Sequence, residues 1–228
     1  MSTRSLPLQG ATWLRPKYLV FAFIFAMMAY VLNHNERFLI NSSDPVWSHY
    51  RPFQWWLLPH GMAAACALLL GPMQFSDRLR QRYVKFHHVV GYLYVIGVVI
   101  GAPIGSYIQF RFDEHSGDPR SFSIATVVDA VLWITATLIA LQFARRGKIT
   151  LHRQWMTRSY AVAIAFLEIR VISGLGGLEN VPGATEAIVW FCVGIAYPLA
   201  DVAIQWPDLW PARKPAAKKI PAATQVAT

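Results

Sequence analysis

Two histidines, His87 and His152, are the residues of this chain whose type and placement could hold a cofactor. Each follows a short basic segment and opens a long apolar run, so each is expected near the start of a membrane helix. A b-type haem needs two neutral imidazoles on facing helices, one on each side of the macrocycle. The pair therefore predicts a haem b site with His87 and His152 as iron ligands.

Basic residues beside these histidines could bind the haem propionates. Arg153 and Arg158 lie in the segment of the second histidine, and Lys85 and His88 lie beside the first. Charge-assisted hydrogen bonds from such groups hold carboxylates well. The alternative is that each histidine only caps its helix at the membrane interface, or bonds a carbonyl of a neighbouring helix, without any metal.

Small residues after His87 leave two interpretations open. Gly91 lies one turn beyond it, and Gly97, Gly101 and Gly105 continue a ridge at four-residue spacing. Such a ridge could leave room for a flat ring between two backbones. It is also the usual device for close helix packing in lipid.

A second polar layer is predicted deeper in the membrane, at His60, Asp129 and Glu168. At 1.5 Å per residue, His60 and Asp129 lie roughly 20 Å from the basic loops. Ionisable groups in lipid usually face the bundle interior and find partners there. We expect His60 and Asp129 to form a polar pair, either as a structural hydrogen bond or as a proton relay that contacts a quinone. Arg170 is expected to extend to the outer interface.

The elements that must position these residues are transmembrane helices. Of the 228 residues, 55% are hydrophobic and 14% are charged, and the mean hydropathy is +0.34. A soluble domain carries nearer a quarter charged residues, so lipid is the expected solvent. The predicted fold class is all-α, a polytopic membrane protein with a six-transmembrane-helix bundle over residues 18–206. The segments that approach or meet the roughly 20 residues needed to cross ~30 Å of hydrocarbon are 16–33, 54–75, 86–109, 122–144, 153–174 and 186–205.

Basic residues give the predicted orientation. Segments 1–17, 76–86 and 145–158 and the tail after Trp210 hold sixteen of the 21 Lys and Arg residues, and the alternate loops hold five. By the positive-inside rule both termini are cytoplasmic, in a bacterial inner membrane. Residues 1–17 are then a cytoplasmic segment, and residues 207–228 a disordered basic tail. The clustering in loops argues against nucleic acid as the partner, despite a net charge of +9.

Two helical hairpins resemble each other. One has a Gln-Phe pair at Gln74, then a basic loop and His87, and the other has a Gln-Phe pair at Gln142, then a shorter basic loop and His152. We therefore predict a tandem repeat with a pseudo-two-fold axis along the membrane normal. The two histidines would lie at equal depth and could face each other across that axis.

Several motifs run along residues 55–175. They are His60, Gly-Pro-Met-Gln-Phe at 71–75, the Arg-rich loop at 78–80, His87 with Gly91 and Tyr94, His-Arg-Gln-Trp-Met-Thr-Arg-Ser at 152–159, and Arg170. Together they resemble a bacterial family of predicted membrane proteins known as domain of unknown function 2306. The family usually has Arg where this chain has His88, which weakens a propionate-binding role there. The resemblance supports the topology and the choice of residues, and it supplies no chemistry.

A looser similarity to cytochrome b561-like six-helix proteins implies haem. Those proteins usually carry two His/His pairs, and this chain has Asp129 where the second pair would need histidine. One haem at most is therefore expected.

The leading functional hypothesis is a small redox module that passes electrons between one b-type haem and a quinone or a respiratory membrane complex. The alternatives are a non-redox accessory or assembly subunit and a small-solute transporter. A transporter is expected to have broken helices at mid-membrane, and Pro103 and Pro198 are the indications of that. Whether the chain is an enzyme stays open, since no nucleophile–base constellation is present.

Overall fold

The computed structural model describes residues 16–37, 41, 43, 45, 47, 50–116, 120–179 and 181–209, so most of the predicted terminal segments 1–17 and 207–228 lies outside it. Over the described ranges the chain is all-α, as predicted, with seven α-helices and one short 3₁₀ helix. They are α1 (Pro16–His34), the 3₁₀ helix η3 (Arg51–Phe53), α3 (Gln54–Gln74), α4 (Asp77–Arg82), α5 (Val84–Ser116), α6 (Arg120–Arg145), α7 (Ile149–Leu175) and α8 (Ala184–Leu209).

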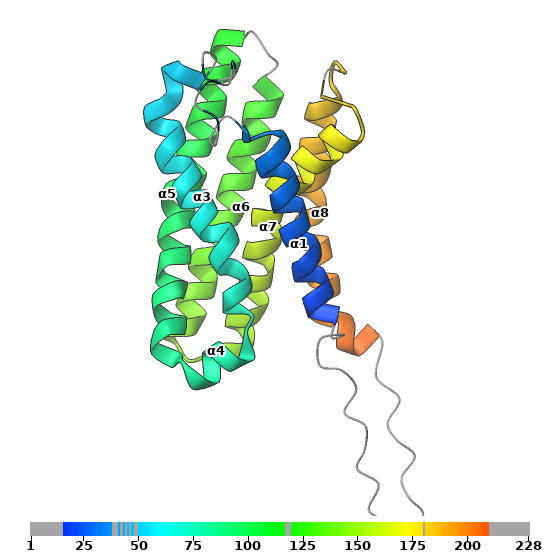
Figure 1. Ribbon diagram of the computed structural model, residues 1–228. Coiled ribbons are helices and arrows are strands. Elements are labelled where there is room, and N and C mark those ends of the chain that lie inside the picture. The colour runs from blue at the N-terminus through cyan, green and yellow to red at the C-terminus, as the bar shows by residue number, and fades with distance from the viewer. Residues whose placement is uncertain are drawn as a thin grey trace, which may run out of the picture.

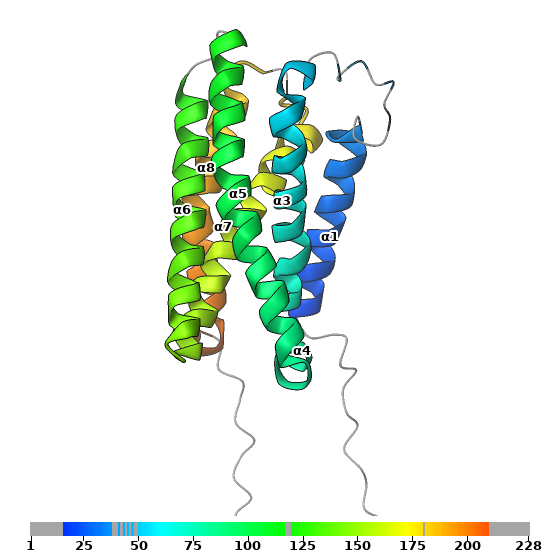
Figure 2. The same cartoon turned by 90° about the vertical axis from the view of Figure 1, so that its left-hand side faces the viewer.

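The six long helices run side by side along one axis, and the short helix α4 lies at one end of the bundle (Figures 1 and 2). The α6–α7 turn, the start of α1 and the end of α8 lie at the same end. We call it the α4 end, and the opposite end the far end. All six predicted helical segments are therefore helices, with ends within a few residues of those expected except at α5, which continues to Ser116.

Helix α4 lies within the basic segment that was predicted to be a loop. Ser76 begins it, with a side-chain oxygen that accepts a hydrogen bond from the backbone N–H of Leu79 at 3.3 Å, and Asp77 lies in its first turn. Both residues are typical of a helix N-terminus. The helix has six residues and no apolar period, so the capping signal was its only sign.

In the part of the chain that the structure describes, four helices are long and apolar enough to cross a membrane, and the chain is a multi-pass membrane protein. The four stretches are Arg51–Gln74, Val84–Arg111, Arg120–Arg145 and Ala184–Trp206. The apolar part of α1, Tyr18–His34, is shorter. Helices α5 and α8 continue unbroken through Pro103 and Pro198, so the prolines do not produce the mid-membrane breaks that the transporter hypothesis expected.

Helix α7 is the most enclosed helix, because it packs against α1, α3, α6 and α8. Its buried face consists of apolar residues with Ser159, Tyr160 and Ser173 among them. Large apolar side chains such as Phe23, Met62 and Phe191 instead point outward from other helices, as expected of surfaces that face lipid. Since α7 meets protein on several sides, it tolerates polar residues that a lipid-facing helix would not.

The glycine ridge of α5, from Gly91 to Gly105, faces α3 along its whole length. A Cβ atom added at Gly97 would lie 2.7 Å from the carbonyl oxygen of Ala63, and one at Gly101 would lie 3.3 Å from the Ala63 Cβ. The ridge therefore serves close packing of two helices. Because these glycines face α3, the space that they leave is filled by α3.

Candidate functional site

The two predicted ligands lie at the α4 end of the bundle, on different helices. His87 is the fourth residue of α5, and His152 is the fourth residue of α7. The His87 ring lies within electrostatic range of His152 and of Arg80. Seven residues beyond each histidine, the hydroxyls of Tyr94 and Ser159 are hydrogen-bonded at 2.8 Å. Because seven residues return to the same helix face, the histidines lie at similar depths on faces that approach each other.

The two imidazoles differ in their hydrogen bonds. Nδ1 of His152 donates to the carbonyl oxygen of Ala140 in α6 at 2.9 Å, which fixes the tautomer and leaves Nε2 free to accept a proton or a metal. Nδ1 of His87 is buried and has no partner among the described residues. His88 beside it is exposed. One ring is therefore held in place, and the other has an unsatisfied nitrogen.

A cavity of about 30 Å³ lies beside His152. Its lining consists of Gln74, Phe75, Arg80, His152, Arg153 and Met156. This volume has room for one or two water molecules. Cofactors and drug-sized ligands occupy pockets of several hundred Å³. As these side chains are packed, the space beside His152 does not fit a haem, and haem binding stays a prediction.

The two arginines predicted to bind the haem propionates, Arg153 and Arg158, contact different parts of the bundle. Arg153 is exposed and lines the cavity. Arg158 instead binds Asp201 of α8, with its Nε and Nη2 atoms 2.8 and 2.7 Å from the Oδ1 atom, and lies over the Trp155 ring at 5.0 Å. This arginine does not line the cavity beside His152, and its role toward a propionate stays a prediction. Six residues turn a helix by about 240° beyond His152, so the arginine faces α8.

The predicted polar pair of His60 and Asp129 does not form. Nδ1 of His60 donates to the carbonyl oxygen of Gly101 at 2.8 Å, with the ring packed against Gly105. Asp129 is on α6, and its Oδ1 atom is buried without a hydrogen-bond partner in the described part of the chain. Helix α5 packs against both α3 and α6 and separates the two residues. His60 is therefore satisfied by the helix it packs on, and Asp129 is not.

Asp129 lies in an acidic site between α6, α7 and α8, which we define as Asp129, Glu168, Cys192 and Tyr197. The fully buried Cys192 lies within electrostatic range of Glu168 and Asp129, and Tyr197 lies within range of Asp129. At 1.5 Å per residue, Asp129 and Glu168 are about 24 and 28 Å from the α4 ends of their helices. The site is thus deep in the bundle and closer to the far end. Cys192 and Tyr197 were not among the predicted site residues.

A ring of four buried polar residues joins α5, α6 and α7 between the histidines and the acidic site. Trp133 Nε1 donates to the Tyr94 hydroxyl at 3.2 Å, and the Thr137 hydroxyl donates to the Trp133 carbonyl oxygen at 2.7 Å. Because the one hydroxyl hydrogen of Thr137 is used, Ser159 must donate to Thr137, at 2.7 Å. Tyr94 must then donate to Ser159. Every hydroxyl and indole hydrogen of this buried ring has an acceptor.

Sequence reasoning missed this ring, although its spacing was visible. Tyr94 and Ser159 each follow a predicted ligand by seven residues. On α6, Asp129, Trp133 and Thr137 recur every four residues, which places them in one stripe along the helix. The stripe runs along α6 from the acidic site to the ring.

At the far end, Arg170 lies over the Phe166 ring at 5.4 Å, and Glu36, just after α1, is within electrostatic range of it. Burial raises the pKa of the Glu36 carboxyl, and the Arg170 guanidinium partly opposes that shift. These two charges lie at the far end beyond Glu168.

The family described as "Predicted membrane protein (DUF2306)" matches residues 57–204. No curated protein and no solved structure matches the chain. The match extends from α3 into α8, so it includes both histidines, the buried ring and the acidic site, and it leaves out α1. The chain belongs to the DUF2306 family of predicted membrane proteins, as the sequence motifs predicted.

Proposed function

We propose that this membrane protein binds and releases protons at Asp129, inside its helix bundle, in the service of a redox or transport process. One observation carries the proposal. Among the residues that the structure describes, the Asp129 Oδ1 atom is buried without a hydrogen-bond partner, whereas the polar side chains of the ring one turn away are all satisfied.

A carboxylate in a low-dielectric interior is costly unless it is paired or protonated. Helix packing alone would be served better by an apolar or a fully hydrogen-bonded side chain at this position. Among the described residues, no group of three or more His, Cys, Asp and Glu side chains is placed to hold a metal ion. A proton needs only one such group, so the proton is the ligand that this site supports best.

Polar groups lie between Asp129 and both ends of the bundle. Towards the α4 end, the α6 stripe continues through Trp133 and Thr137, and His152 with its free Nε2 atom lies beyond at the water-sized cavity. Towards the far end, Glu168 and then Arg170 lie on α7. His152 and Glu168 are the titratable groups along this line, one toward each end, whereas Trp133 and Thr137 are held in the ring.

The proposal includes the membrane arrangement. We infer that α1 and α7 also cross the bilayer, which gives six crossings in a bacterial inner membrane with the α4 end in the cytoplasm, and that the α3–α5 and α6–α7 hairpins are related repeats. Helix α7 has 27 residues, or about 40 Å, which exceeds the hydrocarbon thickness. Its charged residues are tolerable in the membrane because protein surrounds it.

A second candidate is electron transfer through one b-type haem between His87 and His152, with Asp129 supplying protons to a quinone or a respiratory partner. The free Nε2 atom of His152 favours it. Met156 and Phe75 would have to move to admit the ring. A Soret band in oxidised and dithionite-reduced protein that disappears in both His87→Ala and His152→Ala would support it. A folded, colourless protein that takes up no haemin would exclude it.

The proton site is tested with a hydrophobic carbodiimide, which reacts with protonated carboxyl groups in apolar surroundings. Peptide mapping of the labelled protein is expected to find the adduct on Asp129. Asp201, held by Arg158, and the exposed Asp208 are internal controls that should stay unlabelled. Labelling of those controls to the same extent as Asp129, or none on Asp129 in folded protein, would contradict the proposal. Either result would favour an accessory subunit in which Asp129 has a purely structural role.

A further inference from the structure

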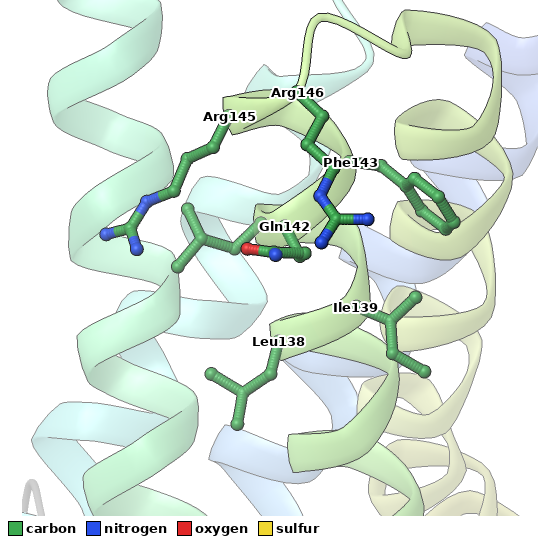
Figure 3. Close-up of a pocket in the computed structure, with 7 residues that line it drawn as sticks. Leu138, Ile139, Gln142, Phe143, Arg145 and Arg146 are labelled. Carbon is green, nitrogen blue, oxygen red and sulfur yellow. The ribbon is translucent and has the colours of Figure 1, made fainter.

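The α4 end of α6 carries an open groove on the outer surface of the bundle (Figure 3). Its volume is about 440 Å³, and its lining is apolar along the helix with two arginines at the end. The lining residues are Leu138, Ile139, Leu141, Gln142, Phe143, Arg145 and Arg146. None of them belongs to the acidic site or to the histidine region.

The two arginines of this groove reach back toward the membrane. Figure 3 shows both guanidinium groups at the level of Gln142, on either side of it. Side chains on a helix lean toward its N-terminus, and α6 runs toward the α4 end, so Arg145 at its last position leans toward the apolar part of the groove. Arg146 lies in the turn that follows α6. With its amide turned, Gln142 accepts hydrogen bonds from Arg146 Nε and Nη2 at 3.2 and 3.0 Å. Arg146 is therefore held over the groove.

In the described part of the chain, no acidic side chain neutralises the charge of this groove. No acidic side chain lines it, and within the described ranges the ion pairs of the chain involve neither Arg145 nor Arg146. Arginine suits phosphate especially well, because its planar fork donates two hydrogen bonds in parallel. Two exposed arginines beside an apolar surface thus fit a ligand that has a phosphate at one end and hydrocarbon at the other.

We propose that this groove binds one anionic glycerophospholipid. Its phosphate lies between Arg145 and Arg146, and an acyl chain lies along Leu138 and Ile139. The surrounding membrane provides such molecules at this surface. A zwitterionic headgroup would bring an ammonium group toward the two guanidinium groups, so charge complementarity selects an anionic lipid. This site does not depend on the proton-binding role of Asp129.

The test is native mass spectrometry of the full chain in neutral detergent, with equal amounts of phosphatidylglycerol and phosphatidylcholine. We expect one phosphatidylglycerol molecule to remain bound preferentially. The double variant Arg145→Gln/Arg146→Gln should weaken this binding about twenty-fivefold, since each basic residue near a lipid surface contributes about fivefold. The matched control is Arg78→Gln/Arg82→Gln, which removes the same charge from exposed positions on α4 and should change binding little.

Three results would overturn the lipid site. One is an equal loss of binding in the control variant, which would mean that any basic residues at this end suffice. Another is equal retention of phosphatidylcholine by the unmodified chain. The third is displacement of phosphatidylglycerol by inorganic phosphate at similar concentration, which would assign the arginines to a soluble anion.

Discussion

The buried ring and the acidic site share one stripe of α6, yet they differ in how their polar atoms are satisfied. Trp133 and Thr137 belong to a ring in which every hydroxyl and indole hydrogen has an acceptor. Asp129, one turn away, has a buried oxygen without a hydrogen-bond partner in the described part of the chain. The same helix face thus carries polar groups of two kinds. One kind fixes how α5, α6 and α7 pack, and the other remains available for a ligand.

The comparison distinguishes two kinds of polar side chain inside a membrane protein. One kind stabilises the packing of helices, and the other can bind a ligand. A satisfied network stabilises one arrangement of its helices, and removing a member leaves the others unpaired. An unsatisfied carboxylate does the opposite, because it costs free energy whenever it is charged. Substitutions in the two regions should therefore change the free energy of unfolding in opposite directions.

The largest effect is expected for Ser159→Ala, which breaks the ring where two of its bonds meet. Tyr94 loses its acceptor and Thr137 loses its donor, both in buried positions, so the free energy of unfolding should fall by about 1–3 kcal/mol. Thr157→Val on the same helix is the control, because the Thr157 hydroxyl bonds only the Arg153 carbonyl of its own helix. Thermal unfolding in detergent measures both, and equal losses would mean that the ring is not a special network.

The substitution Asp129→Leu is expected to change the free energy of unfolding in the opposite direction. It removes a carboxylate whose buried Oδ1 atom has no partner within the described ranges, so the protein should be as stable as the unmodified chain or more stable by up to about 2 kcal/mol. Asp129→Asn, which keeps the shape, separates charge from packing. A loss of stability in both variants comparable with that of Ser159→Ala would show that Asp129 has a structural partner, and the contrast between the two regions would disappear.

Breaking the Arg158–Asp201 pair should change the free energy of unfolding by an amount between the changes expected for Ser159→Ala and Asp129→Leu. Arg158 is a charged group satisfied by a close partner, but 21% of the arginine side chain and 42% of the aspartate side chain are exposed. Arg158→Gln is therefore expected to cost about 1 kcal/mol or less. The same unfolding assay measures it, and adding Asp201→Asn to that variant should cost little more, because the two residues act as one pair.

The smallest expected change in stability comes from the titration of Glu36 at the far end. Because burial raises the pKa of this carboxyl, the folded chain holds its proton more tightly than the unfolded chain does. Glu36 therefore contributes stability below its ordinary pKa, and that contribution is lost as pH rises through the raised pKa. Glu36→Gln should flatten the acid-side pH dependence of the unfolding temperature. If the unfolding temperature of Glu36→Gln varied with pH in the same way as that of the unmodified chain, this prediction would be wrong.

The sequence predicted the helices well and their polar contacts poorly. Long apolar runs bounded by basic loops fixed the helix ends, and local motifs identified the family. The partners of His60 and Arg158 depend on helix rotation and on which helices are neighbours. Hydropathy does not report either property. The six-residue count from His152 to Arg158 was enough to place the arginine off the histidine face. The partner of His60 required the packing of α3 on α5.

The ring was hidden for a different reason. Its four members are uncharged, and hydropathy and charge patterns single out charged residues instead. The four are Tyr94, Trp133, Thr137 and Ser159. Their common spacing from the histidines and from Asp129 was readable, but the closed circuit needs three helices at once. Buried hydroxyls at matched depths on several predicted helices are thus a useful signal of where a membrane bundle is fixed.

The central claim, that Asp129 exchanges a proton inside the bundle, is tested most directly by infrared difference spectroscopy of the protein in lipid across a pH step. We predict a band from a protonated carboxyl group in apolar surroundings that changes with pH, is present in the Asp208→Asn control and is absent in Asp129→Asn. A spectrum of Asp129→Asn identical to that of the unmodified chain would contradict the account.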